Sequence, residues 1–496
     1  MDLGAKGRSS SVTLTAFILL LAPACAQGVA LDDSATATAT VTATGTGSTA
    51  ADTGATEPGT SSGEPDDTGA TEATSSGGEE SSSSGDESSG GETTTGEPLD
   101  NPELYPFGLV HSPISMAVAA NMRAIATSVP GKNPAAFTRV GDTIAASASF
   151  LQCFATDDGF LMLPPEVSLT ATINHFRTDL GGGTNSWNHV SAAATAGWMS
   201  DALVTGLPTP VGNEVAMILP GFAHVMSGTH DLEKDGPEAL WTFADNLLAV
   251  VDQLTTNGVV PVLSTIPQRP DKPLLIPRFN GVIRAIAQGR QIPLLDLNFA
   301  LSKLPMTGLV DMGIDLSVFT SVDVPRPCHF TEAALQFGYN VHNLESLRAL
   351  DRARQVVVEM TAFLGAPPPK LMGVGTAKNP IVVPSLPFVD FRSTADSASD
   401  NIDNYGGTCD GAVVQTGPER FYRLDVKDPV TVRAMVFGRS PVNVDLHVLT
   451  GLTPDTCVKR DEQEITGPLP PGTYYLVVDT DGDLVAGDYA LVILPE

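Results

Sequence analysis

The chain has 496 residues, a formal net charge of -30 and a hydrophobic fraction of 42%. This length allows more than one domain, and this hydrophobic fraction is enough to fill ordinary protein cores. The excess of acidic residues argues against a nucleic-acid-binding protein, because phosphate backbones are bound by clustered Lys and Arg.

Residues 1–26 have the pattern of an export signal. Two basic residues precede an apolar run at 12–22, and small residues follow it. The run is shorter than the roughly 20 apolar residues of a membrane-spanning helix. Two endings fit: ordinary cleavage among the small residues around Cys25, or a segment at 21–25 that resembles a bacterial lipobox, in which Cys25 would be lipidated. We therefore predict an exported protein, either a cell-envelope lipoprotein anchored to the membrane through Cys25 or an extracellular protein.

Residues 27–104 are predicted to form a disordered acidic linker. The segment consists mainly of Ser, Thr, Gly, Ala, Asp and Glu, and it contains neither Lys nor Arg. Such a composition cannot bury enough apolar surface to offset the entropy that ordering would cost. Repulsion between its like charges extends the linker further.

Residues 105–365 alternate short apolar runs with segments of helical periodicity, which predicts strands alternating with helices. The predicted strands are 137–140, 222–226, 259–266 and 293–297, and the predicted helices are 145–154, 237–256, 276–288 and 331–363. This order is typical of a parallel sheet covered by helices on both faces. In such folds the functional side chains lie on loops at the carboxyl ends of the strands.

The last part of the chain changes character. Residues 366–387 are rich in Pro and Gly and are predicted to be a linker. In residues 388–496, runs such as 422–426 and 444–448 alternate apolar with polar residues, and turn residues separate these runs. Alternation with a period of two and frequent turns predicts an antiparallel β-sandwich.

Four short blocks follow one another along the α/β segment. They are Gly141-Asp142-Thr143, the glycine-rich stretch 181–185, Gly228-Thr229-His230-Asp231, and His329 before the last helical pattern. With these blocks in this order, the chain resembles the SGNH/GDSL hydrolases, a family of serine esterases and lipases, over roughly residues 136–349. The resemblance implies a flavodoxin-like three-layer α/β/α sandwich.

The resemblance also implies roles for individual residues. In the family a serine hydroxyl attacks an ester carbonyl, a histidine accepts its proton, and a carboxylate orients the histidine. Here Thr143 occupies the nucleophile position and His329 the position of the base. Arg326 stands where the orienting Asp is expected, which leaves Asp323 as the nearby carboxylate.

The oxyanion hole of the family uses backbone amides, a glycine and an asparagine side chain. The resemblance assigns these positions to Gly183 and to His230, which replaces the asparagine. A ring N–H can donate a hydrogen bond to an oxyanion, although its reach differs from that of an amide. The extra methyl of Thr143 crowds its turn and restricts its χ1 angle.

These departures leave two functions open. The first is a weakly active ester hydrolase that acts on a small acyl ester, such as an O-acetylated glycan or a lipid. The second is a catalytically silent cell-surface protein that keeps the hydrolase fold and binds a glycan or matrix component. In either case we expect a monomer without a cofactor or a metal ion.

The segment 388–496 resembles bacterial pre-peptidase C-terminal domains. The residues that carry this resemblance are 417–419, 444–447 and 471–475. The family provides accessory β-sandwich modules on extracellular proteins, some of them linked with matrix or polysaccharide binding. The alternative is a module that only protects or spaces the rest of the protein.

The cysteines fit an oxidising compartment. If Cys25 is lipidated, four cysteines remain, and an even number in an exported protein suggests two disulfides. The division into domains would pair Cys153 with Cys328 and Cys409 with Cys457. Four unpaired thiols are the alternative.

Overall fold

The computed structural model describes residues 102–496 except 235, 237, 311–312, 410–413 and 482–485. The predictions for the export signal, for Cys25 and for most of the acidic linker lie outside the described residues. All described residues belong to one compact unit. Among them, no helix has both the length and the apolar character that crossing a membrane requires.

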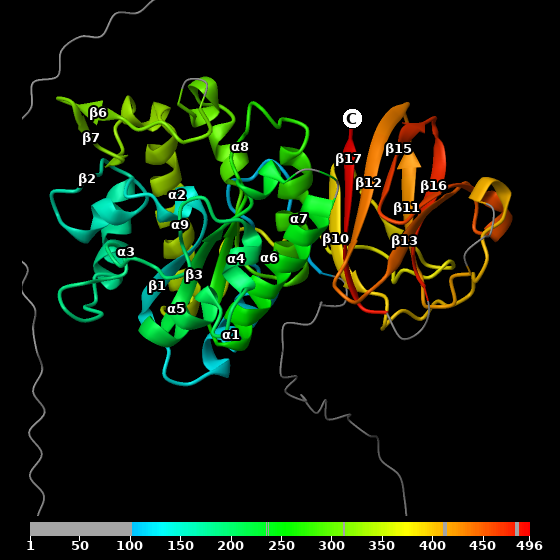
Figure 1. Ribbon diagram of the computed structural model, residues 1–496, viewed down its shortest axis with the longest axis horizontal. Helices are drawn as coiled ribbons and strands as arrows, with labels where there is room; N and C mark the ends of the chain where they lie inside the picture. Colours follow the sequence, from blue (N-terminus) through cyan, green and yellow to red (C-terminus); the bar gives the residue numbers. More distant parts are fainter. Residues whose placement is uncertain (1–101, 235, 237, 311–312, 410–413, 482–485) are drawn as a thin grey trace, which may run out of the picture. The chain divides into compact units, whose positions relative to one another are not determined.

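A parallel sheet forms the centre of the α/β domain (Figure 1). Its strand order is β1-β3-β4-β5, with β1 at Asn133–Gly141, β3 at Pro220–Met226, β4 at Val260–Ser264 and β5 at Leu294–Leu295. All neighbouring strands run parallel. Every residue of β3 and β4 is buried, as expected of strands covered on both faces. The α/β architecture predicted from the sequence is therefore confirmed.

Two groups of helices cover the sheet. The first contains α1 (Met116–Ser128) and α9 (Gly338–Val357), which contact each other, and the second is a row of α5 (Pro210–Ile218), α6 (Glu238–Thr256) and α7 (Ile276–Gly289). Helix α6 follows the predicted periodicity closely. Its buried apolar side chains recur at helical spacing along one face and pack in the core: Leu240, Phe243, Leu247, Val250, Val251 and Leu254.

The helix predicted at 145–154 is wrong. The structure has a short helix α2 at Thr143–Ala146, and a 3₁₀ turn follows only at Gln152–Ala155. Between these two elements, Ser147 Oγ accepts a hydrogen bond from the Ser149 backbone N–H. This side-chain bond takes the N–H that a continuing helix would use. Leu151 then adopts a left-handed conformation, with φ at 63°, which ends any continuous helix.

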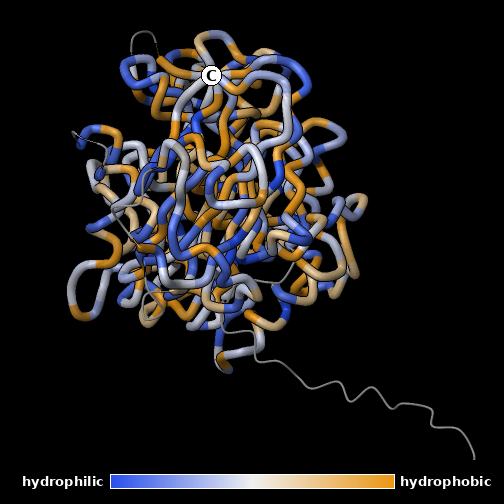
Figure 2. The backbone as a smooth tube through the Cα atoms, turned by 90° about the vertical axis from the view of Figure 1, so that its right-hand side faces the viewer, coloured by the Kyte–Doolittle hydropathy of each residue, from blue (hydrophilic) through white to orange (hydrophobic). Residues whose placement is uncertain are grey.

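The β-domain consists of two packed sheets. One has the order β10-β17-β12-β15 and the other β14-β13-β16-β11-β9. The strands are β9 (Ile381–Val382), β10 (Phe388–Ser393), β11 (Arg420–Val426), β12 (Val430–Gly438), β13 (Val444–Leu449), β14 (Cys457–Asp461), β15 (Glu464–Leu469), β16 (Gly472–Thr480) and β17 (Asp488–Pro495). All pairs are antiparallel except β9 with β11. In Figure 2 the β-domain lies toward the viewer, and hydrophobic and hydrophilic segments are interspersed in it.

Two predicted boundaries differ from the structure. The stretch 366–387 is not only a linker, because Leu371, Ile381 and Val383 are buried in the core of the β-domain. The sequence did not predict this packing, because the few apolar residues are separated by many Pro and Gly residues. At the end of the predicted disordered stretch, the Leu104 N–H donates to the Pro369 carbonyl oxygen at 3.1 Å.

Helix α7 joins the two domains by packing against β10 and β17 (Figure 1). Its glycines permit this close approach: a Cβ on Gly281 would lie 2.6 Å from Val492 Cγ1, and one on Gly289 would overlap Phe391. The Trp241 indole N–H of α6 also donates to the Val436 carbonyl at 2.8 Å. Apolar side chains of both domains belong to one continuous core. The β-domain is therefore packed as part of the same folded body.

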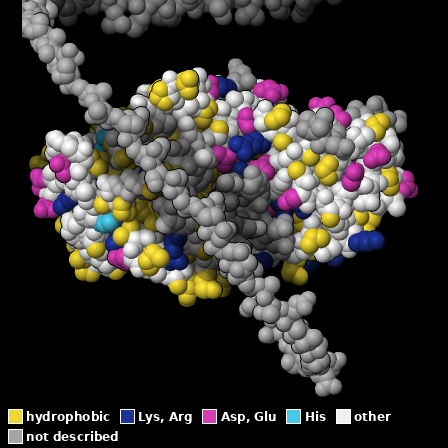
Figure 3. Space-filling model, turned by 90° about the horizontal axis from the view of Figure 1, so that it is seen from below, with side chains coloured by type: hydrophobic (Ala, Val, Ile, Leu, Met, Phe, Trp, Pro, Cys, Tyr) yellow, Lys and Arg dark blue, Asp and Glu magenta, His cyan; other side chains and the backbone are white. Residues whose placement is uncertain are grey.

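Charged side chains do not segregate by sign on the visible part of the face in Figure 3. Asp and Glu side chains lie interspersed with Lys and Arg, and hydrophobic side chains lie between them. Many of the ion pairs connect residues of one domain, such as Arg348 with Glu166 and Arg177 with Asp157. Each of these pairs has at least one partner that is open to solvent, and such pairs contribute about 0–1 kcal/mol each. The stability of the fold therefore depends mainly on its buried apolar core.

Two buried histidines should make the stability of the α/β domain sensitive to acid. Burial lowers the pKa of His224 to about 3, and burial places the pKa of His342 well below its ordinary value of 6.5. The His342 ring stacks on Phe150 at 4.2 Å, and neither of its nitrogens has a hydrogen-bond partner among the described residues. Below pH 6.5 these histidines bind a proton in the unfolded state but stay neutral in the folded state. The free energy of unfolding is therefore highest above pH 6.5 and decreases as the pH falls below it.

We expect His342→Leu to reduce this acid sensitivity. One buried neutral histidine changes the free energy of unfolding by about 1.4 kcal/mol per pH unit below its unfolded pKa. Between pH 7.5 and pH 5, the wild type should therefore lose ~2 kcal/mol more than the variant. Urea unfolding at the two pH values measures the difference, and the comparison cancels any packing cost of leucine. An equal loss in both proteins would contradict the prediction.

Candidate active site

The site lies where β1 and β3 end side by side. The two strands are in register at their last residues, Gly141 and Met226, so the loops that follow begin at the same edge of the sheet. Gly141 has φ at 148°, and any Cβ there would collide with the Met226 carbonyl oxygen. Only glycine allows the strand ends to approach this closely. The loop after β1 begins with Asp142 and Thr143.

Asp142 connects the two loops. Its carboxylate accepts hydrogen bonds from the Ile144 N–H at 3.3 Å and from the Thr229 N–H at 3.0 Å. Burial raises the pKa of Asp142 to about 6, although these N–H donors favour the ionised form. The bond to Thr229 fixes the residue directly before His230 next to the start of α2.

The Thr143 hydroxyl contacts the His230 ring. Thr143 Oγ1 lies 2.7 Å from His230 Nε2, and the Gly197 backbone N–H donates to the same Oγ1 at 2.8 Å. Since Oγ1 already accepts from Gly197, its own hydrogen is free to be donated to Nε2. This arrangement has the geometry of a nucleophile hydrogen-bonded to a general base.

A carboxylate lies behind the imidazole. His230 Nδ1 is 3.2 Å from Glu233 Oε1, a contact that favours the tautomer with the proton on Nδ1, in which Nε2 can accept from Thr143. Glu233 closes the short 3₁₀-helix η3 (Asp231–Glu233), which His230 caps. The three side chains form a hydroxyl–imidazole–carboxylate chain, the order found in catalytic triads.

Sequence reasoning missed Glu233, although a signal was available. His230 and Glu233 are three residues apart, and side chains at this spacing lie above one another in a 3₁₀ turn. The acidic residue was overlooked because the family resemblance directs attention to a carboxylate before His329.

Gly197, and not the predicted Gly183, contacts Thr143. The segment 193–195 runs beside β1: the Gly141 N–H donates to the Ala193 carbonyl at 2.9 Å, and the Thr195 N–H donates to the Gly141 carbonyl at 3.3 Å. Gly197 follows this segment at the same edge of the sheet. Gly183 lies in an exposed turn, and no described hydrogen bond joins it to Thr143. The segment consists of small residues and shows no alternation of apolar and polar residues. The sequence therefore did not predict that it pairs with β1.

Asp231 holds the Gly197 segment against the His230 loop. Its buried carboxylate accepts from the Ser200 N–H at 3.0 and 3.1 Å and from Ser200 Oγ at 2.5 Å. Burial raises the pKa of Asp231, and the bonds from Ser200 partly oppose this shift. These bonds join the segment that carries Gly197 to the loop that carries His230.

The structure does not bring His329 and Asp323 to Thr143. Among the described contacts, none joins the His329 ring to either residue. His329 ends β8 (Cys328–His329), which pairs with β2 (Phe160–Leu161). Asp323 is exposed in the turn between β6 (Thr320–Ser321) and β7 (Val324–Pro325).

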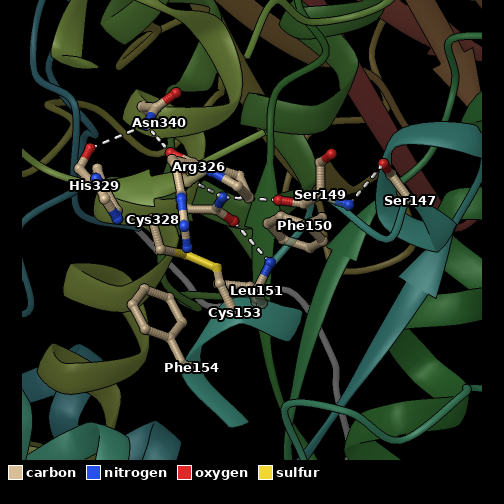
Figure 4. Close-up of a disulfide and its surroundings, with 12 residues drawn as sticks. Ser147, Ser149, Phe150, Leu151, Cys153, Phe154, Arg326, Cys328, His329 and Asn340 are labelled. Atoms are coloured by element: carbon tan, nitrogen blue, oxygen red, sulfur yellow. Dashed lines mark hydrogen bonds between the residues drawn. A yellow bond between two sulfur atoms is a disulfide. The ribbon is translucent and has the colours of Figure 1, made fainter. Parts of the chain in front are cut away.

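The His329 segment is held by its backbone. Figure 4 shows the Asn340 side chain reaching the carbonyl oxygens of Arg326 and His329, at 2.8 and 2.9 Å. The adjacent Cys328 forms a disulfide with Cys153, and Cys409 forms one with Cys457. This is the pairing that the division into domains predicted. Burial and the neighbouring charge of Arg326 lower the pKa of His329, which favours its neutral form.

The described residues offer no metal site of the common type. Among them, no group of three or more His, Cys, Asp or Glu side chains is arranged to hold a metal ion.

No protein-family model matches the sequence, and no curated protein is similar to it. Among solved structures, a GDSL-like lipase from Bacteroides thetaiotaomicron is 13% identical, with 48% of this chain and 99% of that chain covered and a TM-score of 0.29. The pre-peptidase C-terminal domain of a Bacillus anthracis collagenase is 15% identical, with 23% and 91% covered and a TM-score of 0.16. A two-domain esterase active on acetylated mannans is 10% identical, with 81% and 98% covered and a TM-score of 0.25.

The described chain consists of an α/β domain built around a parallel sheet and a β-domain of two packed, mainly antiparallel sheets. This architecture is of the fold class that the resemblances drawn from the sequence imply. Likeness at this identity concerns the fold alone, so the chemistry must be inferred from the side chains of this chain.

Proposed function

We propose that the protein hydrolyses small acyl esters, with Thr143 as nucleophile and His230 as general base. The observation that carries this proposal is the 2.7 Å contact between Thr143 Oγ1 and His230 Nε2. Glu233 at Nδ1 supports it, since a carboxylate there orients the ring and stabilises the imidazolium that forms. In this proposal His230 replaces His329 as the base, and Glu233 replaces Asp323 as the orienting carboxylate.

The reaction has two halves. Thr143 Oγ1 bonds to the ester carbonyl carbon while its proton passes to His230 Nε2; the C–O bond to the alcohol then breaks, and His230 returns the proton to the alcohol. In the second half His230 takes a proton from water, the water oxygen attacks the acyl carbon, and the Thr143 ester bond breaks as Oγ1 recovers a proton. We assign oxyanion stabilisation to the Gly197 N–H, which donates to Oγ1 at 2.8 Å in the resting site and would transfer this hydrogen bond to the carbonyl oxygen as Oγ1 bonds to carbon.

The proposed substrate class is an acyl ester carried by a glycan or a lipid, as the resemblance to SGNH/GDSL hydrolases implies. The methyl group of Thr143 predicts slow turnover, because it restricts χ1 and crowds the attacking oxygen. A silent binding protein with the same fold is the competing function, and the experiment below separates the two.

Replacing Thr143 tests the proposal. With the full chain and p-nitrophenyl acetate, we expect measurable hydrolysis by the wild type and a loss of about 10³ or more in kcat for Thr143→Ala, because the nucleophile is removed. Thr143→Ser keeps the hydroxyl and removes the methyl, so it should be at least as fast as the wild type.

Three outcomes would contradict the proposed enzyme. Full activity in Thr143→Ala would mean that another group is the nucleophile. An inactive wild type with an inactive Thr143→Ser would favour the binding protein. An inactive wild type with an active Thr143→Ser would identify a hydrolase site silenced by the threonine methyl.

A further inference from the structure

A buried arginine lies behind the His230–Glu233 pair. Arg269 follows β4, and only 4% of its side chain is exposed. Its Nη1 donates to the Thr229 carbonyl oxygen at 2.9 Å and lies 3.5 Å from Glu233 Oε1. Its Nε and Nη2 donate to the two carboxylate oxygens of Asp271 at 2.9 and 2.8 Å. The guanidinium is thus fixed on one edge by Asp271 and presents the other edge to the His230 loop.

We propose that Arg269 is a positioning residue that keeps Glu233 directed at His230 Nδ1. The inference rests on the proposed function, because it concerns the orientation of the proposed base. Glu233 is 43% exposed, and a glutamate at such a position has several rotamers of similar energy. Attraction to the rigid guanidinium selects the rotamer that also meets the imidazole.

Arg269 also fixes the backbone that carries His230. The peptide groups of Thr229 are held on both sides: its N–H donates to Asp142, and its carbonyl accepts from Arg269. Asp142 belongs to the loop after β1 and Arg269 to the loop after β4, while Thr229 lies in the loop after β3 between them. The ends of three adjacent strands are therefore linked at the residue before the base.

A purely structural role for Arg269 predicts different behaviour. If its pairing with Asp271 only stabilises the loop, replacing Arg269 should lower stability, and its effect on catalysis should be independent of Glu233. If Arg269 acts through Glu233, its effect on catalysis should largely disappear once Glu233 cannot orient the ring. A double-mutant cycle distinguishes these cases, because coupled residues show non-additive effects.

The cycle uses the full chain, p-nitrophenyl acetate, and the variants Arg269→Gln, Glu233→Gln and the double variant. We expect Arg269→Gln to lower kcat about 10-fold with KM changed less than about 2-fold, and the double variant to be within about 3-fold of Glu233→Gln alone. Arg269→Lys keeps the charge without the fork and should recover part of the loss. Effects on kcat that multiply in the double variant would overturn the inference.

A second measurement does not depend on activity. Nitrogen-15 NMR of labelled histidines, with His230→Gln to assign the signal, reports which ring nitrogen of His230 carries the proton. We expect the Nδ1–H form in the wild type and a shift toward the Nε2–H form in both Arg269→Gln and Glu233→Gln. An unchanged ring in Arg269→Gln would overturn the inference. An inactive wild type with the expected ring shifts would remove the proposed function and leave the positioning role standing.

Discussion

Replacing His230 with glutamine should abolish most ester hydrolysis, whereas replacing His329 should leave most of it. Thr143 Oγ1 is 2.7 Å from His230 Nε2, and none of the described contacts joins Thr143 to His329. Loss of a general base typically costs 10²–10⁴ in rate, so we expect His230→Gln to lower kcat/KM about 10³-fold and His329→Gln to lower it less than about 3-fold. Initial rates with p-nitrophenyl acetate at pH 7.5 measure both.

The matched control is His175→Gln. His175 Nε2 donates to the Pro134 carbonyl oxygen at 2.9 Å, and none of its described hydrogen bonds involves a residue of the site. This variant should keep wild-type activity, and thermal unfolding of all three variants checks that each is folded. The opposite result, with activity lost in His329→Gln and kept in His230→Gln, would restore the arrangement of the family. It would also require the segment held by Asn340 and Cys328 to move toward Thr143 during turnover.

The positions of Thr143 and His230 could be predicted because they depend on strand ends. An apolar run that ends in glycine predicts a loop at the edge of a parallel sheet, and two such runs place their loops together. Residues far apart in the sequence are then brought close by the topology alone. The same reasoning located the long helix α6 from the spacing of its apolar residues.

The partners of these residues could not be predicted in the same way. Gly197 reaches Thr143 only because an irregular segment of small residues runs beside β1, and such a segment has no periodicity. Whether His230 or His329 contacts the hydroxyl depends on how each loop is held. Asn340 and the Cys153–Cys328 disulfide hold the His329 segment, while Asp142 and Arg269 hold the His230 loop. These are side-chain contacts between distant parts of the chain, and no local pattern encodes them.

The second large effect concerns the junction of the two domains: Gly289→Ala should destabilise the protein. In an exposed helix this change would stabilise by about 1 kcal/mol, because alanine loses less backbone entropy than glycine. At this position the new Cβ would overlap Phe391 Cβ and lie 2.7 Å from its Cγ. Overpacking of a buried interface costs about 1–3 kcal/mol or more, so the clash should outweigh the gain in propensity.

Urea unfolding of the full chain measures this effect, with Gly212→Ala as the matched control. Gly212 lies in α5, and a Cβ there would meet the side-chain ends of Gln253 and Thr209, each at 3.1 Å, and Pro208 Cβ at 3.9 Å, which is an ordinary contact. Because those ends can shift, the control should change stability by less than about 1 kcal/mol. An apolar cluster is continuous across the junction of α7 with β10 and β17, so the wild type should unfold in a single transition. Gly289→Ala should separate this transition into two as α7 is pushed away from β10, and a single transition at higher urea would mean that the helix can move without loss of packing.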